Sequence, residues 1–111
     1  MASLTDRLDE AVAKAHLEPS HVARAVDTNP RTVVRWLAGE SSPRPAARER
    51  LLELIAVIGR LSGVLEPQAA HDWFFTPSPL LQNQKPIDLL TKGRYRDVLG
   101  AVDALAEGVF I

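Results

Sequence analysis

The sequence predicts an all-α protein, and three observations lead to that prediction. Apolar residues recur at helical spacing in every segment between the prolines, and no alternating apolar and polar run indicates a strand. Hydrophobic residues make up 46% of the 111 positions, which is enough for a globular core. Aromatic residues make up only 5%, so that core must be largely aliphatic. Helices that pack through aliphatic faces are therefore expected throughout.

The N-terminal part of the chain carries start signals for three helices. Ser3 begins the first helix, with Asp6 three residues later in a variant of the capping box, and the apolar stripe runs to about His16. A second, short helix follows Pro19. The pair Asn29-Pro30 begins the third, because asparagine caps free backbone N–H groups and proline fits the first helical position.

The second and third helices have the layout of a DNA-reading helix-turn-helix. The turn, Asp27–Asn29, lacks the glycine often found there, and the third helix is expected to run to Ala38 and close at Gly39. In such motifs the start of this helix enters the major groove, where arginine pairs with guanine and threonine contacts a thymine methyl group. The expected core anchors of the helix are Val33, Val34, Trp36 and Leu37. The predicted DNA-binding residues are Asn29, Arg31, Thr32, Arg35, Arg44 and Arg48.

The charge of the chain supports DNA binding only locally. The net charge is −1, but residues 31–50 hold five arginines against two glutamates, a local charge of +3. The segment from Val64 onward carries four basic and six acidic residues, a charge of −2, so two different partners are expected. DNA binding would require a dimer that sums two basic patches. The alternative is an ordinary helical hairpin whose arginines are solvated.

The rest of the chain is also expected to be helical. A long helix from about Ala46 to Leu65 is apolar around most of its circumference, so it must be buried on several sides, in part against a second copy of the chain. We expect two domains, residues 1–65 and 66–111. The later elements are expected to be a helix from Pro67 through Trp73–Phe75, an irregular connection 76–84, a short helix 87–92 capped by Gly93, and a final helix from Tyr95 to about Gly108.

The residue inventory argues against an enzyme. The chain has no cysteine, which excludes disulfides and thiol chemistry and fits a reducing cytoplasm. His16, His21 and His71 lack the spacing of a metal site. His71 and Asp72 are neighbours on a helix, so their side chains point about 100° apart and do not form a dyad. No catalytic residue, metal or cofactor is predicted. Without a signal peptide or an uncharged apolar span, a soluble cytoplasmic protein is expected.

Two blocks of sequence carry a resemblance to the Xre/MbcA/ParS family of antitoxins. Residues 23–61, ARAVDTNPRTVVRWLAGESSPRPAARERLLELIAVIGRL, are similar to the family's Xre-like helix-turn-helix half. Residues 72–109, DWFFTPSPLLQNQKPIDLLTKGRYRDVLGAVDALAEGV, are similar to its small helical toxin-binding domain. The resemblance implies a cognate RES-domain toxin that degrades NAD, with the antitoxin covering the mouth of the toxin's NAD pocket. It also implies that the pair can repress its own operon through the Xre-like half.

The resemblance assigns roles to residues near the C-terminus. The family's turn is matched by Pro86, Leu89, Leu90, Thr91 and Gly93, and Gly108 matches a glycine near the family's C-terminus. The predicted toxin-binding residues are Trp73, Lys92, Gly93, Arg94, Arg96, Gly108, Val109, Phe110 and Ile111. Two features depart from the family. Gln82–Gln84 stands where relatives often carry a glycine-rich loop, and the three residues after Gly108 reach at most about 10 Å.

Several alternatives stay open at this point. Tyr95 and Leu99 are expected in the core, whereas Arg94 and Arg96 either contact the toxin or are solvated. The leading function is a protein inhibitor of an NAD-degrading toxin. The second is a plain helix-turn-helix repressor with a dimerising C-terminal half, and an enzyme or small-ligand sensor is remote. The expected partners are the RES-domain toxin, operator DNA and further copies of the chain in a homodimer and larger hetero-oligomers, with no membrane.

Overall fold

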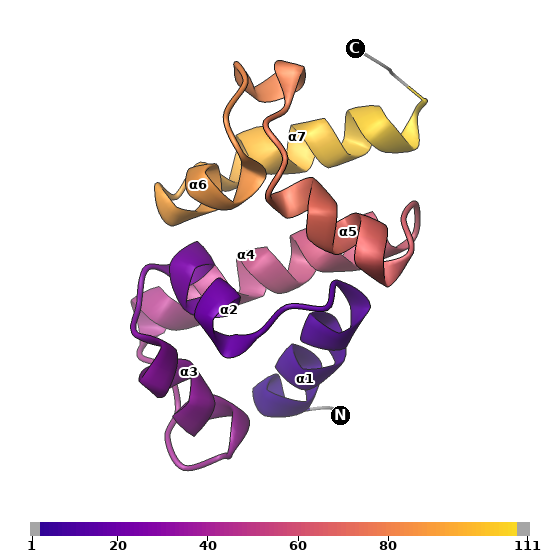
Figure 1. Ribbon diagram of the computed structural model, residues 1–111. Coiled ribbons are helices and arrows are strands. Elements are labelled where there is room, and N and C mark those ends of the chain that lie inside the picture. The colour runs from indigo at the N-terminus through magenta and orange to yellow at the C-terminus, as the bar shows by residue number, and fades with distance from the viewer. Residues whose placement is uncertain (1–2, 109–111) are drawn as a thin grey trace.

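The computed structural model describes residues 3–108 and confirms the all-α prediction, because this range contains seven α-helices and a single 3-10 helix and no strand (Figure 1). The helices are α1 (Leu4–Lys14), α2 (Pro19–Val26), α3 (Pro30–Leu37), α4 (Pro45–Ser62), α5 (Pro67–Phe74), α6 (Pro86–Thr91) and α7 (Tyr95–Ala106), and the 3-10 helix is η1 (Pro79–Leu81). No helix in the described range is long and apolar enough to cross a membrane.

Local signals place the helix ends within about three residues of their expected positions. Ser3 Oγ accepts a hydrogen bond from Asp6 N at 3.1 Å, and Ser3 N donates to Asp6 Oδ2 at 3.4 Å, which completes the capping box of α1. Asn29 Oδ1 accepts from Arg31 N at 2.8 Å and caps α3. Gly39 and Gly93 have φ of 74° and 77°, so each closes the preceding helix in the left-handed conformation.

The turn between α2 and α3 keeps helix-turn-helix geometry without a glycine. Asp27 takes the left-handed conformation at φ 57° and ψ 55°, a region that aspartate and asparagine tolerate better than other non-glycine residues. Thr28 N then donates to Ala23 O at 2.8 Å, which closes the end of α2. The two helices pack against each other at the lower left of Figure 1.

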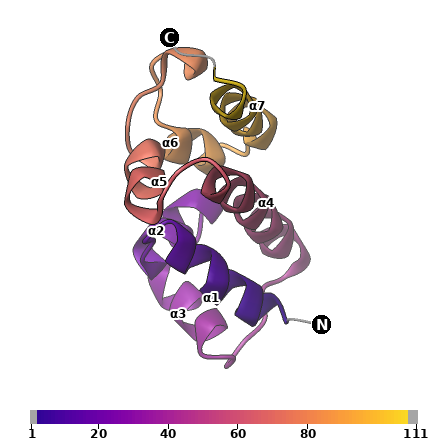
Figure 2. The ribbon, with the colours of Figure 1, turned by 90° about the vertical axis from the view of Figure 1, so that its right-hand side faces the viewer.

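Helix α4 is the central support of the molecule. Five of its apolar side chains are at most 1% exposed, and helices lie on both sides of it. Helices α1 and α2 pack against one side and α5 and α7 against the other (Figures 1 and 2). The sequence predicted that this helix is buried on several sides, in part against a second copy of the chain. Its four neighbouring helices already cover much of that apolar surface within one chain. The buried residues of α4 are Leu51, Leu54, Val57, Ile58 and Leu61.

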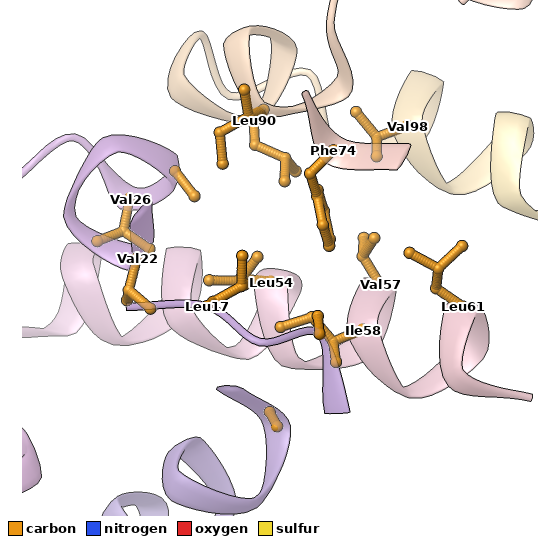
Figure 3. Close-up of a cluster of buried hydrophobic side chains, with 14 of the residues drawn as sticks. Leu17, Val22, Val26, Leu54, Val57, Ile58, Leu61, Phe74, Leu90 and Val98 are labelled. Carbon is orange, nitrogen blue, oxygen red and sulfur yellow. The ribbon is translucent and has the colours of Figure 1, made fainter. Parts of the chain in front are cut away.

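The core is shared by the two halves of the chain. Figure 3 shows Phe74 of α5, which is fully buried, pointing toward Leu54 and Val57 of α4, with Val22 of α2 and Val98 of α7 in the same buried cluster. The division into two domains, residues 1–65 and 66–111, stays a prediction. In space, side chains from both ranges form one hydrophobic cluster.

Arg50 ties the two halves together by polar contacts. It is half-buried in the first turns of α4, and its Nη2 donates to Leu90 O at 2.8 Å and to Thr91 O at 2.7 Å. These carbonyl groups lie in the last turn of α6, where a cation is favourable. Next to them is Gly93, where an added Cβ would lie 3.5 Å from Arg50 Nη1. This arginine was counted in the basic segment of the sequence, but its guanidinium is committed to the fold.

We predict that Arg50→Met destabilises the protein by about 2 kcal/mol, because hydrogen bonds to a charged donor contribute roughly 1.5–3 kcal/mol and the substitution leaves two helix-end carbonyls without this donor. Urea unfolding of the purified chain measures the change. Arg48→Met is the matched control, since Arg48 lies half a turn earlier on α4 and is exposed. Equal midpoints for the two variants would contradict the structural role of Arg50.

A cluster of aromatic rings joins the start of α2 to α5. The ring centroid of His21 lies 5.2 Å from that of His71 and 5.0 Å from that of Phe75. His21 Nδ1 accepts a hydrogen bond from Glu18 N at 3.0 Å, which requires a neutral ring. Burial, and then the neighbouring His71, lower the pKa of His21, with a further lowering by Arg24 and an opposing effect of the Glu18 carboxylate.

We predict that the free energy of unfolding decreases as the pH falls below about 6.5, the ordinary histidine pKa. A lowered pKa in the folded state means that the unfolded chain binds a proton first, so this contribution is present at neutral pH and lost in acid. Urea midpoints at pH 7.5 and 5.5 test this. His21→Asn keeps an acceptor for Glu18 N but cannot titrate, so its midpoint should change less. An identical fall in both proteins would assign the effect to other groups.

Candidate functional site

The outward face of α3 is formed by two arginines and a valine. Arg31, Val34 and Arg35 are exposed and lie at positions i, i+3 and i+4 of the helix. The prediction that Val34 anchors α3 in the core is wrong, because 51% of this residue is exposed. The buried face is instead formed by Val33 and Trp36, as expected for both. Within residues 3–108, Arg31 and Arg35 make no ion pair, so their guanidinium groups are free to bind a partner.

The other predicted DNA-binding residues are placed differently. The amide oxygen of Asn29 is occupied by its capping bond, and Thr32 is half-buried. Arg44 and Arg48 are exposed at the start of α4, where Arg48 lines a hollow together with Trp36. The structure therefore brings Arg31 and Arg35 together on one helix face, while Arg44 and Arg48 belong to another element.

The basic cluster around Gly93 is divided into two parts by its turn. Lys92 lines a hollow with Arg24 and Lys85, on the side that faces α2. Arg94 lies beyond the turn, where its Nη2 is 2.6 Å from Asp97 Oδ2, and both side chains line a second hollow next to the 78–84 loop. Arg96 lines a third hollow with Glu53 and Tyr95. Lys92, Arg94 and Arg96 were all predicted to bind the toxin, but Lys92 lines a different hollow from the two arginines.

The 78–84 loop forms a closed turn beside α7. Ser78 N donates to Gln84 O at 3.1 Å, and Asn83 N donates to Ser78 O at 2.8 Å. Gln82 and Asn83 have φ of 56° and 62°, so two consecutive non-glycine residues adopt the conformation that favours glycine. Leu80 at the loop's 3-10 turn is 38% exposed and lines the hollow with Arg94. The sequence pattern predicted an irregular connection here and gave no signal that Leu80 is exposed.

Of the remaining predicted toxin-binding residues, Trp73 lies on α5 and Gly108 follows the C-terminal end of α7. Trp73 is half-buried and its ring centroid is 5.4 Å from that of Phe74. Gly108 is exposed and has a φ of 78°. Val109, Phe110 and Ile111 lie outside the described residues. The core prediction is confirmed for Tyr95, which packs against the buried cluster, but Leu99 is only half-buried and stands outside that cluster.

No assembled reaction centre is seen in the described part of the chain. Across residues 3–108, no group of three or more histidine, aspartate, glutamate or cysteine side chains can hold a metal ion. His71 Nδ1 donates to His16 O at 3.0 Å, whereas Asp72 Oδ1 accepts from Gln68 Nε2 at 3.1 Å. The neighbouring His71 and Asp72 thus bond to different partners.

The fold and these surfaces define a small all-α binding protein with a helix-turn-helix at one end and a loop-bearing surface at the other. No protein-family profile matches the chain. The mycobacterial cidal antitoxin MbcA of Mycobacterium tuberculosis is 40% identical over 108 residues, which cover 97% of this chain and 96% of that protein. A protein of the same organism named "Probable mycobacterial cidal antitoxin" is 33% identical over 90 residues, covering 81% and 76%.

A solved structure extends this similarity to the whole fold. The match, with a TM-score of 0.88 and 39% identity over the full length of both chains, is to a chain in the crystal structure of the M. tuberculosis MbcT-MbcA toxin-antitoxin complex. The chain therefore belongs to the family of MbcA-like antitoxins, and the family resemblance inferred from the sequence is confirmed.

Proposed function

We propose that this chain is the antitoxin of a type II toxin–antitoxin pair and neutralises a RES-domain, NAD-degrading toxin by binding it directly and occluding its active site. The observation that carries the proposal is the full-length match, at a TM-score of 0.88, to a chain in the MbcT-MbcA complex. The RES fold and the NAD chemistry of the partner follow from the family resemblance. The pair would act in the cytoplasm.

Occlusion requires contact area and a few anchors, and no catalytic group. We propose that the toxin-binding surface consists of the predicted residues other than Lys92, together with Leu80 of η1. Arg94 is held by Asp97, so less side-chain entropy is lost when it binds an acidic rim. Leu80 beside it offers an exposed apolar contact. The residues of this surface are Trp73, Leu80, Gly93, Arg94, Arg96, Gly108 and Val109–Ile111.

The helix-turn-helix supports a second part of the proposal, repression of the chain's own operon. The outward face of α3 presents Arg31 and Arg35 for guanine or phosphate, with exposed Val34 between them for a thymine methyl group. Because the net charge is −1, stable binding requires two copies of this face, either in a homodimer or in a larger complex with toxin. A plain repressor with a dimerising C-terminal half is the second candidate.

We predict that deletion of Val109–Ile111 weakens toxin neutralisation, because these apolar residues follow α7 and would enter the toxin pocket. The measurement is growth of cells that co-express the toxin encoded by the adjacent gene. A variant with Ser-Gly-Ser at 109–111 keeps the chain length and tests whether apolar contact is needed. Full growth with the truncated chain at equal abundance would argue against the tail. If the toxin and this chain never copurify, occlusion is excluded and the repressor is favoured.

We predict that Arg31→Ala combined with Arg35→Ala abolishes retention of the operon's upstream DNA in a gel and leaves toxin neutralisation intact. Both side chains are exposed, so the fold should be unaffected. Removing one bidentate base interaction costs about 1–3 kcal/mol, so removing two lowers the affinity by about thirtyfold or more. Arg7→Ala combined with Lys14→Ala removes the same charge from α1 and is the control. Unchanged retention in the α3 variant would remove α3 as the reading helix.

A further inference from the structure

A basic groove lies between α2, the first helix of the helix-turn-helix, and α6 of the C-terminal half. It is an open hollow lined by Arg24 of α2, by Lys85 and Lys92 at the two ends of α6, and by Asp88 and Thr91 between them. We name these five residues the α2–α6 groove. With three cations and one carboxylate, the groove has a net charge of +2, on a chain whose total is −1. A concentration of positive charge of this kind attracts an anion.

The groove is built on fixed elements. Thr91 Oγ1 donates to Arg24 O at 2.6 Å, which joins the end of α6 to α2. The Arg24 guanidinium is paired with Asp88 Oδ1. Lys92 Nζ donates to Gln84 Oε1 at 3.2 Å, so one amide oxygen is its only side-chain partner within residues 3–108. Neither lysine in the groove makes an ion pair there, and both ammonium charges are available to a ligand.

The position of the groove indicates which anion it binds. Helices α6, α2 and α3 are stacked in that order along one side of the molecule in Figures 1 and 2. The groove between α6 and α2 therefore lies one helix away from α3, the helix that carries the exposed Arg31 and Arg35. Together the groove and these two arginines hold five cations and one carboxylate, a charge of +4. A duplex whose major groove receives α3 would run its phosphate backbone past the adjoining elements.

We infer that the α2–α6 groove binds backbone phosphates of the DNA that α3 reads, so that Lys85 and Lys92 of the C-terminal half take part in DNA binding. This inference rests on the DNA-binding part of the proposed function. It assigns Lys92, which the sequence predicted to bind the toxin, to DNA binding, whereas Arg94 and Arg96 beyond Gly93 stay in the proposed toxin-binding surface. Phosphate contacts of this kind strengthen binding to every sequence equally, because they carry no base information.

The test is the salt dependence of DNA affinity for the full chain. We would measure the Kd by fluorescence anisotropy between 50 and 200 mM KCl on two labelled duplexes, the operon's upstream region and an unrelated duplex of equal length. Lys85→Gln combined with Lys92→Gln should weaken binding to both duplexes by roughly fivefold or more for each lysine at 0.1 M salt. The slope of log K against log salt should fall by about 1 for each phosphate that the variant no longer neutralises.

Two further variants make the result specific. Arg7→Gln combined with Lys14→Gln removes the same charge from α1 and should leave both the slope and the affinity nearly unchanged. Asp88→Asn removes the groove's carboxylate and frees Arg24 from its ion pair, so it should tighten binding to both duplexes by about twofold to fivefold. A purely structural role of these residues would not produce tighter binding. Circular dichroism melts establish that each variant is folded.

Each outcome decides for or against the groove. An unchanged slope in the lysine variant, or an equal change in the α1 control, overturns the inference even if Arg31→Ala and Arg35→Ala abolish retention. Weaker toxin binding with unchanged DNA affinity also overturns it and assigns Lys92 to the toxin. If the wild-type chain binds neither duplex, the groove and the repression proposal fail together, while neutralisation of the toxin is judged separately by growth.

Discussion

The burial of α4 on both sides is the constraint on which the other elements depend. One helix contributes side chains to the helix-turn-helix and to the C-terminal half, so neither can move without disturbing the close packing around Leu54, Val57 and Ile58. The outward face of α3 and the 78–84 loop are therefore held in a fixed relation. Rigid surfaces lose little conformational entropy on binding, which is consistent with the proposed inhibition by surface contact.

Some arginines of this protein bind other parts of the chain, and others have no ion-pair partner within residues 3–108. The sequence alone does not distinguish the two groups. Arg50 donates to two carbonyl groups forty and forty-one positions away, and Arg60 pairs with Asp103 at 2.7 Å between α4 and α7. Arg31 and Arg35 have no such partner in the described range. A local charge count treats all of these arginines alike. The structure indicates that only a subset offers its charge to other molecules.

Elements defined by local chemistry were predictable from the sequence, and elements defined by distant contacts were not. Proline and asparagine signals placed α3 correctly, because capping depends on residues within one turn. The two adjacent valines of α3 satisfy the same apolar pattern, so periodicity over eight residues could not decide that Val33 is buried and Val34 exposed. The separation of Lys92 from Arg94 depends on the turn at Gly93, which a linear grouping of basic residues ignores.

The 78–84 loop shows how backbone contacts between its two ends can hold non-glycine residues in the left-handed conformation. This chain adopts positive φ at Gln82 and Asn83 at a cost of about 1 kcal/mol or more for each. Such a backbone persists because the surrounding structure enforces it, here through the bonds between Ser78 and residues 83 and 84. These bonds fix the path of the loop beside Arg94 by backbone contacts rather than by the side chains of Gln82 and Asn83, so the local sequence pattern could not predict it.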